Sequence, residues 1–212
     1  MRILLVAACA IACGQSPRNP MLSPTSSLGP AAVAGITDPA LRDVVADHWE
    51  HLMRWAPTWA TTLGDHRYDD QLAPRDAFSI AAAHGERDAL LTRLVAIDPG
   101  RLGDTDRVTL ALLRGRLEAE RAMDVCKFHE WSVDSANASV FAELSYLVES
   151  HTVKSPRDAA NLVTRMGQGA RLVDDTIANL RLGLSDGRVA SAEKLRRALD
   201  QLDRELGKPV ES

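Results

Sequence analysis

Apolar residues recur every three or four positions from residue 37 to near the end of the chain, and this period restricts the fold more than any other feature of the sequence. The sustained alternation of apolar and polar residues that would indicate strands is missing. Aromatic residues make up only 4% of the chain, whereas Ala and Leu, the best apolar helix formers, are abundant. The sequence therefore predicts an all-α domain. Two of its stripes are Leu41, Val44, Val45, Leu52 and Trp55, and Leu195, Leu199, Leu202 and Leu206.

Start and stop signals divide residues 37–212 into a bundle of about seven helices. Thr37-Asp38-Pro39 and Ser155-Pro156 each place a capping side chain before a proline at the first helical position. Asp98-Pro99-Gly100 is a stop, Asp104 is the expected cap of the next helix, and the glycines near residue 168 indicate a break. The helical segments are expected at about 38–55, 59–63, 74–97, 104–123, 138–149, 155–166, 170–184 and 191–206.

Residues 1–12 have the form of a signal peptide, with Met1-Arg2 followed by an unbroken small or apolar run to Ala12. A helix of that length is about 15 Å long, roughly half of the hydrocarbon core of a bilayer, so we do not expect it to span a membrane. The run ends at Cys13-Gly14 and is similar to a bacterial lipobox, in which the cysteine accepts a diacylglycerol. Cys13 is therefore the predicted lipidation site, and a plain cleaved signal or a chance cysteine is the alternative.

Residues 13–36 are rich in Pro, Ser, Gly and Ala, and we expect a lipid-anchored flexible linker there. The formal net charge of −4 argues against a nucleic-acid partner, which would require a basic surface. With the signal removed and Cys13 acylated, Cys126 is the remaining thiol. It is interpreted as a small buried apolar residue in preference to a nucleophile.

Several short segments follow one another in a recognisable order and spacing. They are Asp47-His48-Trp49-Glu50, Pro57-Thr58-Trp59-Ala60-Thr61, Leu63-Gly64-Asp65-His66-Arg67-Tyr68-Asp69, Leu94-Val95-Ala96-Ile97-Asp98-Pro99, Asp106-Arg107, Ile177-Ala178-Asn179-Leu180-Arg181-Leu182-Gly183-Leu184 and Gly187-Arg188-Val189. Together these segments resemble the bacterial family called domain of unknown function 885, and the resemblance covers about residues 40–208.

The resemblance implies a relation to longer proteins that are similar to zinc metallopeptidases. Their second half carries an H-E-x-x-x-G-H-like helix, whose ligands bind zinc and whose Glu acts as a base. No segment here matches it: His129-Glu130 is the only His-Glu pair, and no histidine follows within the next ten residues. We therefore expect the non-catalytic N-terminal half of such a protein, with no catalytic residue, metal or other cofactor in this chain. Zinc is implied only for full-length relatives, and a missing C-terminal half is an implied partner.

Asp65, His66, Arg67, Tyr68 and Asp69 form the densest polar cluster and are expected in a loop. In a longer relative this loop would line a substrate cleft, with the planar guanidinium of Arg67 holding a carboxylate. The alternative is a structural loop that is braced by an Arg–Asp pair and a turn at Gly64.

Two other groups of polar residues have structural interpretations that we prefer to functional ones. His48 and His51 have a spacing that suits a metal, but His48 lies on the apolar face of its helix and His51 points elsewhere. His129-Glu130-Trp131 with Asp134 would suit acid–base chemistry, but no nucleophile motif accompanies it.

These features lead to two functional hypotheses. The first is an exported, lipid-anchored envelope protein, periplasmic or at the outer membrane, that forms the non-catalytic half of a metallopeptidase-like hydrolase and is inactive alone. Its last helix should then expose apolar surface, with the loop 65–70 bordering the open side. The alternative is a complete helical binding or scaffolding lipoprotein without an enzymatic role. A downstream reading frame that encodes the H-E-x-x-x-G-H helix would favour the first.

Overall fold

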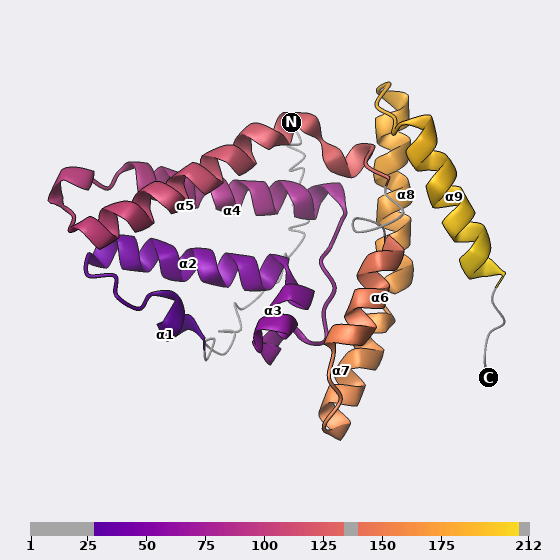
Figure 1. Ribbon diagram of the computed structural model, residues 1–212, viewed down its shortest axis with the longest axis horizontal. Helices are drawn as coiled ribbons and strands as arrows, with labels where there is room; N and C mark the ends of the chain where they lie inside the picture. Colours follow the sequence, from indigo (N-terminus) through magenta and orange to yellow (C-terminus); the bar gives the residue numbers. More distant parts are fainter. Residues whose placement is uncertain (1–27, 134–139, 208–212) are drawn as a thin grey trace, which may run out of the picture.

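The computed structural model describes residues 28–133 and 140–207, and within them every regular element is helical, as the sequence predicts (Figure 1). No helix in these two ranges is long and apolar enough to cross a membrane. The expected signal peptide and Cys13 lie outside them. The elements are α1 Gly29–Ala32, α2 Pro39–Trp55, α3 Pro57–Leu63, η1 His66–Tyr68, α4 Ala77–Val95, η2 Pro99–Arg101, α5 Asp104–Met123, η3 Asp124–Cys126, η4 Phe128–Glu130, α6 Val140–Ser150, α7 Pro156–Met166, α8 Gly169–Ser185 and α9 Ala192–Leu206, where η marks a 3₁₀-helix.

Helices α2, α4 and α5 lie side by side as one layer and enclose the main apolar core (Figure 1). Leucines from all three helices fill it because their apolar residues recur on one face of each helix. This burial is the largest single source of stability in the described part of the chain. Its buried members are Ile36, Leu41, Val44, Leu90, Leu91, Leu94, Leu102, Leu110 and Leu117.

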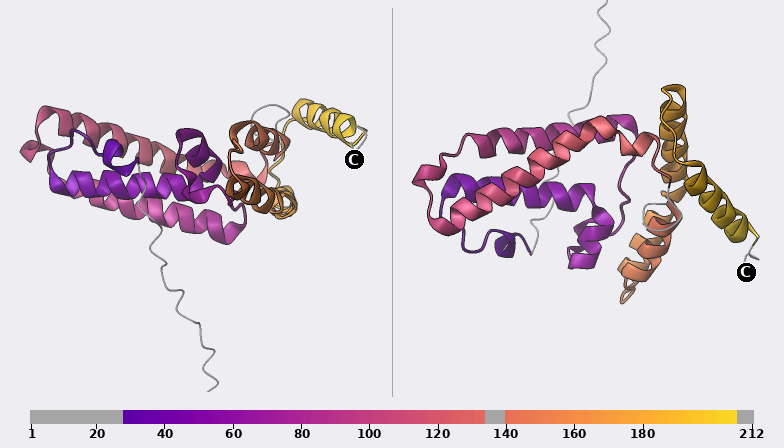
Figure 2. Two further views of the ribbon diagram at one scale, coloured as in Figure 1. Left: turned by 90° about the horizontal axis from the view of Figure 1, so that it is seen from below. Right: turned by 45° about the horizontal axis from the view of Figure 1, so that its top comes forward.

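Helices α6, α7 and α8 form a second layer that runs across the end of the first (Figures 1 and 2). α3 contacts α6, and η4 packs against α8, so the two layers meet at these elements. The apolar core of the second layer is small, with Leu72, Leu147 and Leu172 as its buried members. Much of the apolar surface of the second layer therefore stays uncovered.

Side-chain caps set the starts of α2, α4, α7 and α9, and the starts of α4 and α5 differ from the sequence prediction. The carboxylate of Asp76 accepts a hydrogen bond from the Ser79 amide, so α4 begins at Ala77 and not near residue 74. Gly103 is the N-cap of α5, which places Asp104 in the first turn and not at the cap. There the negative charge of Asp104 still interacts favourably with the positive end of the helix dipole.

The domain reaches further toward the N-terminus than expected. Residues 28–36, which the sequence assigned to the linker, include the short helix α1, and the side chain of Ile36 is buried in the main core. Just after it, the Thr37 hydroxyl donates to the buried carboxylate of Asp106, 2.7 Å away, and the Asp38 amide donates to the same oxygen. These bonds fasten the start of α2 to α5.

Helix α8 packs with a face that the sequence did not predict. The expected apolar stripe contains Val173, Ile177, Leu180 and Leu184, yet Leu184 is 66% exposed. The buried positions are Gly169, Leu172, Asn179 and Gly183, because Asn179 donates to the Arg75 carbonyl and Gly183 admits the backbone of η4. The apolar stripe of α8 is therefore left facing away from the packed contact.

Substitution of two helical glycines should test this packing. A methyl group at Gly183 would overlap the Glu130 carbonyl, so Gly183→Ala should lower the free energy of unfolding by about 2 kcal/mol. Gly115 of α5 is the matched control because nothing lies within 4 Å of an added Cβ there. Gly115→Ala should raise stability by about 0.5–1 kcal/mol. Urea denaturation measures both, and two small changes of the same sign would contradict the contact between α8 and η4.

Candidate functional site

The most deeply buried polar group of the described chain is the side chain of Arg165 in α7, which has no exposed surface. Its guanidinium donates to the hydroxyl of Thr61, 2.9 Å away, and to the carbonyls of Tyr68 and Pro57. Burial lowers the pKa of Arg165, and the nearby carboxylate of Asp69 opposes this shift. One cation thus joins α7 to α3 and to the loop that follows it.

Asp69 connects this cation to the polar loop that the sequence singled out. Its carboxylate accepts a hydrogen bond of 2.6 Å from the Thr61 hydroxyl, lies 2.8 Å from Nδ1 of His66 and stands 3.8 Å from Arg165. The loop begins at Gly64, whose φ of 90° is readily adopted only by glycine. The chain can therefore turn back sharply after α3 and bring Asp69 beneath it.

The guanidinium of Arg67 already donates hydrogen bonds to carboxylates of this chain. Its Nε and Nη2 donate to the two oxygens of Asp65 at 2.9 and 2.7 Å, and its Nη1 donates to Glu50 at 2.7 Å. The hydrogen bond to Asp65 raises the pKa of Arg67. The planar guanidinium that was considered for a substrate carboxylate is thus occupied by carboxylates of this chain.

The structure brings together the five residues of the predicted cleft loop but turns most of them inward. Asp65, Tyr68 and Asp69 are buried, and only His66 presents a well-exposed side chain. These contacts agree with the structural interpretation of the loop as a brace between Gly64 and an Arg–Asp pair. The loop packs against α3 and α7, and the expectation that it borders an open apolar side stays a prediction.

The two histidines of α2 have separate surroundings. His48 is buried, and its Nε2 has no hydrogen-bond partner. Nδ1 of His51 lies 3.0 Å from Glu86, which also accepts a hydrogen bond from Trp55. Among the residues that the structure describes, no three His, Cys, Asp or Glu side chains are placed to hold a metal ion. The donor sets present there do not fit the zinc that the family resemblance implies for longer relatives.

Glu130 is part of an ion pair with Arg188. Its buried carboxylate accepts a 2.7 Å hydrogen bond from Nε of Arg188, and Lys127 lies 3.3 Å away. Burial alone would raise the pKa of Glu130, but the hydrogen bonds from these two cations lower it. The expected partner Asp134 lies outside the described residues.

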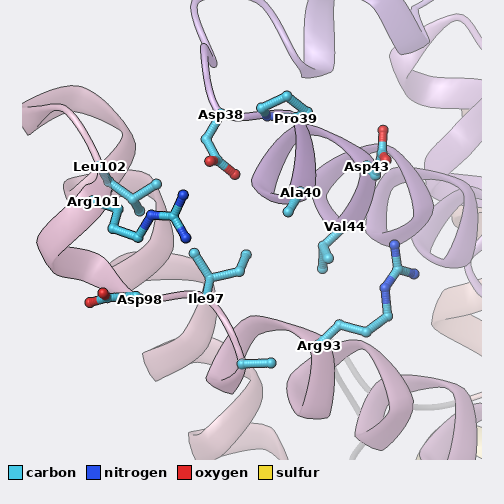
Figure 3. Close-up of a pocket in the computed structure, with 11 residues that line it drawn as sticks. Asp38, Pro39, Ala40, Asp43, Val44, Arg93, Ile97, Asp98, Arg101 and Leu102 are labelled. Atoms are coloured by element: carbon cyan, nitrogen blue, oxygen red, sulfur yellow. The ribbon is translucent and has the colours of Figure 1, made fainter.

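One hollow of about 620 Å³ lies where α2 meets the end of α4 and η2 (Figure 3). Arg93 and Arg101 reach it from opposite sides, and Ile97 lies between them (Figure 3). Arg93 is paired with Asp47. Asp38, Asp43 and Asp98 also belong to the lining, so charges of both signs surround the hollow and favour no particular ligand.

A second hollow of about 540 Å³ has mainly apolar walls and is lined by α8 and α9 together with residues of α4, η4 and α6. Val173, Ile177 and Leu180 of α8, which belong to the apolar stripe of that helix, form one side. A few polar groups, including His129 and Asn179, also belong to its lining. We call this hollow the α8–α9 groove.

Sequence reasoning missed the residues that join the layers. Arg165, Gln168 and Asn179 were not singled out, although each bonds to backbone of the segment 57–75. The available signal was an arginine one helical turn after Leu162, on the side of α7 expected to be apolar. The expected apolar residue Val163 is instead 72% exposed.

An all-α protein with a polar brace inside and an uncovered apolar groove is thus the class that fold and site define. The chain belongs to the family described as bacterial protein of unknown function (DUF885), whose model matches residues 57–212. That range holds the brace, both sides of the groove and the whole second layer. No curated protein matches the chain.

Acid should destabilise the protein through His48. Burial lowers the pKa of His48 from 6.5 to about 4, so between these values the unfolded chain binds a proton that the folded chain does not. Stability should therefore fall from pH 7 toward pH 4, by about 3 kcal/mol from this residue. Urea denaturation across this range measures the loss. His48→Leu should remove this part of the pH dependence, and an unchanged slope would contradict the burial of an uncharged imidazole.

Proposed function

We propose that this protein is a lipid-anchored envelope protein whose helical domain is the non-catalytic half of a metallopeptidase-like hydrolase. Membership of the family supports the proposal, together with the signal-like segment and Cys13 of the sequence. In this proposal the chain supplies a docking and positioning surface, and a catalytic half that carries the zinc-binding helix supplies the chemistry.

The observation that carries the proposal is the uncovered apolar stripe of α8. Of the four buried residues of α8, which are Gly169, Leu172, Asn179 and Gly183, only Leu172 contributes a large apolar side chain. The same helix keeps Ile177 and Leu184 at 40% and 66% exposure. Monomeric proteins rarely leave a contiguous apolar surface of this kind without a binding partner.

The shape of the groove favours a helix of the catalytic half as its occupant. Part of the lining comes from α8 and α9, which diverge from their meeting point, and the apolar side chains that these two helices contribute are spaced by helical turns. The sparse polar groups at the rim would set the register of an incoming helix, while the apolar walls would supply the affinity. The brace around Arg165 keeps α7, and with it the start of α8, fixed for docking.

A binding experiment with the catalytic half of a full-length family member tests the proposal. The full chain should bind that half with a dissociation constant in the micromolar range or tighter. Leu180→Asp places a charge in the groove and should weaken binding at least about tenfold. Isothermal titration calorimetry measures the affinity, and peptide hydrolysis should require both halves.

The matched control changes the neighbouring leucine of the same helix. Leu182 is 46% exposed and does not line the groove, so Leu182→Asp should leave the affinity unchanged. Circular dichroism verifies that both variants keep their helices. Absence of binding by the unaltered chain, or equal losses in the two variants, would contradict docking through the groove.

Removal of the Cys13 thiol tests the anchor. Cys13→Ala should abolish labelling by a radioactive or clickable fatty acid and move the protein from the membrane fraction to the soluble fraction. Serine at the neighbouring cysteine, Cys9→Ser, is the control and should keep the label. An unaltered chain that is already soluble and unlabelled would contradict the lipoprotein assignment.

The alternative, a complete binding or scaffolding lipoprotein, is supported by the same groove. Apolar walls with a few polar groups are also the form of a small-molecule site. Binding of a long-chain fatty acid in place of the catalytic half, lost in Leu180→Asp and kept in Leu182→Asp, would favour this alternative.

A further inference from the structure

The last described helix, α9, carries a regular heptad stripe. Ala192, Leu195, Leu199, Leu202 and Leu206 follow one another at alternating steps of three and four residues. This is the spacing at which two helices pair along a narrow seam, with the residues of one filling the gaps of the other. In heptad terms Ala192, Leu199 and Leu206 occupy the a positions, and Leu195 and Leu202 occupy the d positions.

The stripe has no partner in the described structure. No residue of α9 is buried, and Leu199 and Leu206 are 58% and 78% exposed. Both figures show α9 leaving the end of α8 at an angle, with its C-terminal end away from the rest of the molecule (Figures 1 and 2). The side of α9 that lines the α8–α9 groove contains Ala198, Gln201 and Leu202, so most of the stripe looks outward.

We propose that the stripe binds α9 of a second copy of this chain, with the two helices antiparallel. The charged residues beside the stripe favour a second copy of α9 as the partner and the antiparallel orientation of the two helices. Arg196 and Asp203 occupy the two e positions, both are exposed, and within the described residues neither side chain forms a salt bridge.

In an antiparallel pair, residues at e of one helix lie beside residues at e of the other. Arg196 of each copy then meets Asp203 of the second copy, and the two-fold symmetry produces this ion pair twice. Along the seam, Leu195 faces Leu206 and Leu199 faces Leu202. A parallel pair would instead place e beside g, so that Arg196 would face Ser191 and Asp203 would face Ala198, without any charge pairing.

The interface is small, so the association should be weak and reversible. Two heptads bury few leucines, but α9 is already helical in the chain and loses little conformational entropy on pairing. We expect a monomer–dimer equilibrium with a dissociation constant on the order of 10–100 μM.

Charge reversal with complementation tests both the occupant and the direction. The full chain carrying Cys13→Ala, which lacks the proposed acyl anchor, is studied by analytical ultracentrifugation. Arg196→Glu and Asp203→Arg should each weaken self-association about tenfold, because each change creates two like-charge contacts. An equimolar mixture of the two variants should form a heterodimer at least as tight as the unaltered dimer, since every contact at e is then of opposite charge.

Matched controls lie on the other face of the same helix. Arg197 pairs with Glu193 within the chain, and Asp200 is exposed away from the seam. Arg197→Glu and Asp200→Arg repeat the same charge changes there and should leave self-association unchanged. Leu199→Glu should abolish it, with helicity verified by circular dichroism.

Two results would overturn the proposal. One is a chain that stays monomeric at several hundred micromolar. The other is a dimer that the variants at Arg196 and Asp203 do not weaken, or that their mixture does not restore. The proposal does not rest on the proposed function: it requires no catalytic half, and a chain that fails to bind that half should still dimerise through α9.

Discussion

The buried guanidinium of Arg165 is the interaction on which the junction of the two helical layers depends. A buried cation is costly unless its donors find acceptors, and here Thr61 and the carbonyls of Pro57 and Tyr68 accept from Nη2, whereas the buried Nε has no hydrogen-bond partner. The loop between α3 and α4 therefore has to bring its backbone to α7. The inward position of Asp69, which holds His66 and Thr61, follows from the same requirement.

The two layers differ in how completely they bury their apolar residues. One layer therefore contributes most of the stability, and the other contributes surfaces for binding partners. The layer of α2, α4 and α5 closes over a core of leucines from all three helices. The layer of α6 to α8 packs largely through polar and small residues, and it leaves the stripe of α8 beside a groove. Stability therefore resides mainly in the first layer, whereas the second layer and α9 offer the surfaces that fit other helices.

Sequence patterns predicted the helices well because capping side chains and apolar periods act locally. Asp38, Ser155 and Ser191 each cap the helix that was expected to follow them. The same patterns misplaced the packed faces of α7 and α8. Periodicity identifies the apolar side of a helix, but it assumes that the apolar side is the buried one. Arg165 and Asn179 are buried instead, because carbonyl groups of the segment 57–75 require donors there.

The sequence by itself determined the all-α class, the order and approximate bounds of the helices, the heptad stripe of α9 and the resemblance to the family to which the chain belongs. These depend on neighbours along the chain, where spacing is known in advance. Only the tertiary structure decided that Arg67 is satisfied by Asp65 and Glu50, that Asp69 lies beneath α3, and that α8 turns its apolar stripe toward a groove. These depend on which distant backbone groups approach one another, and no local pattern specifies that.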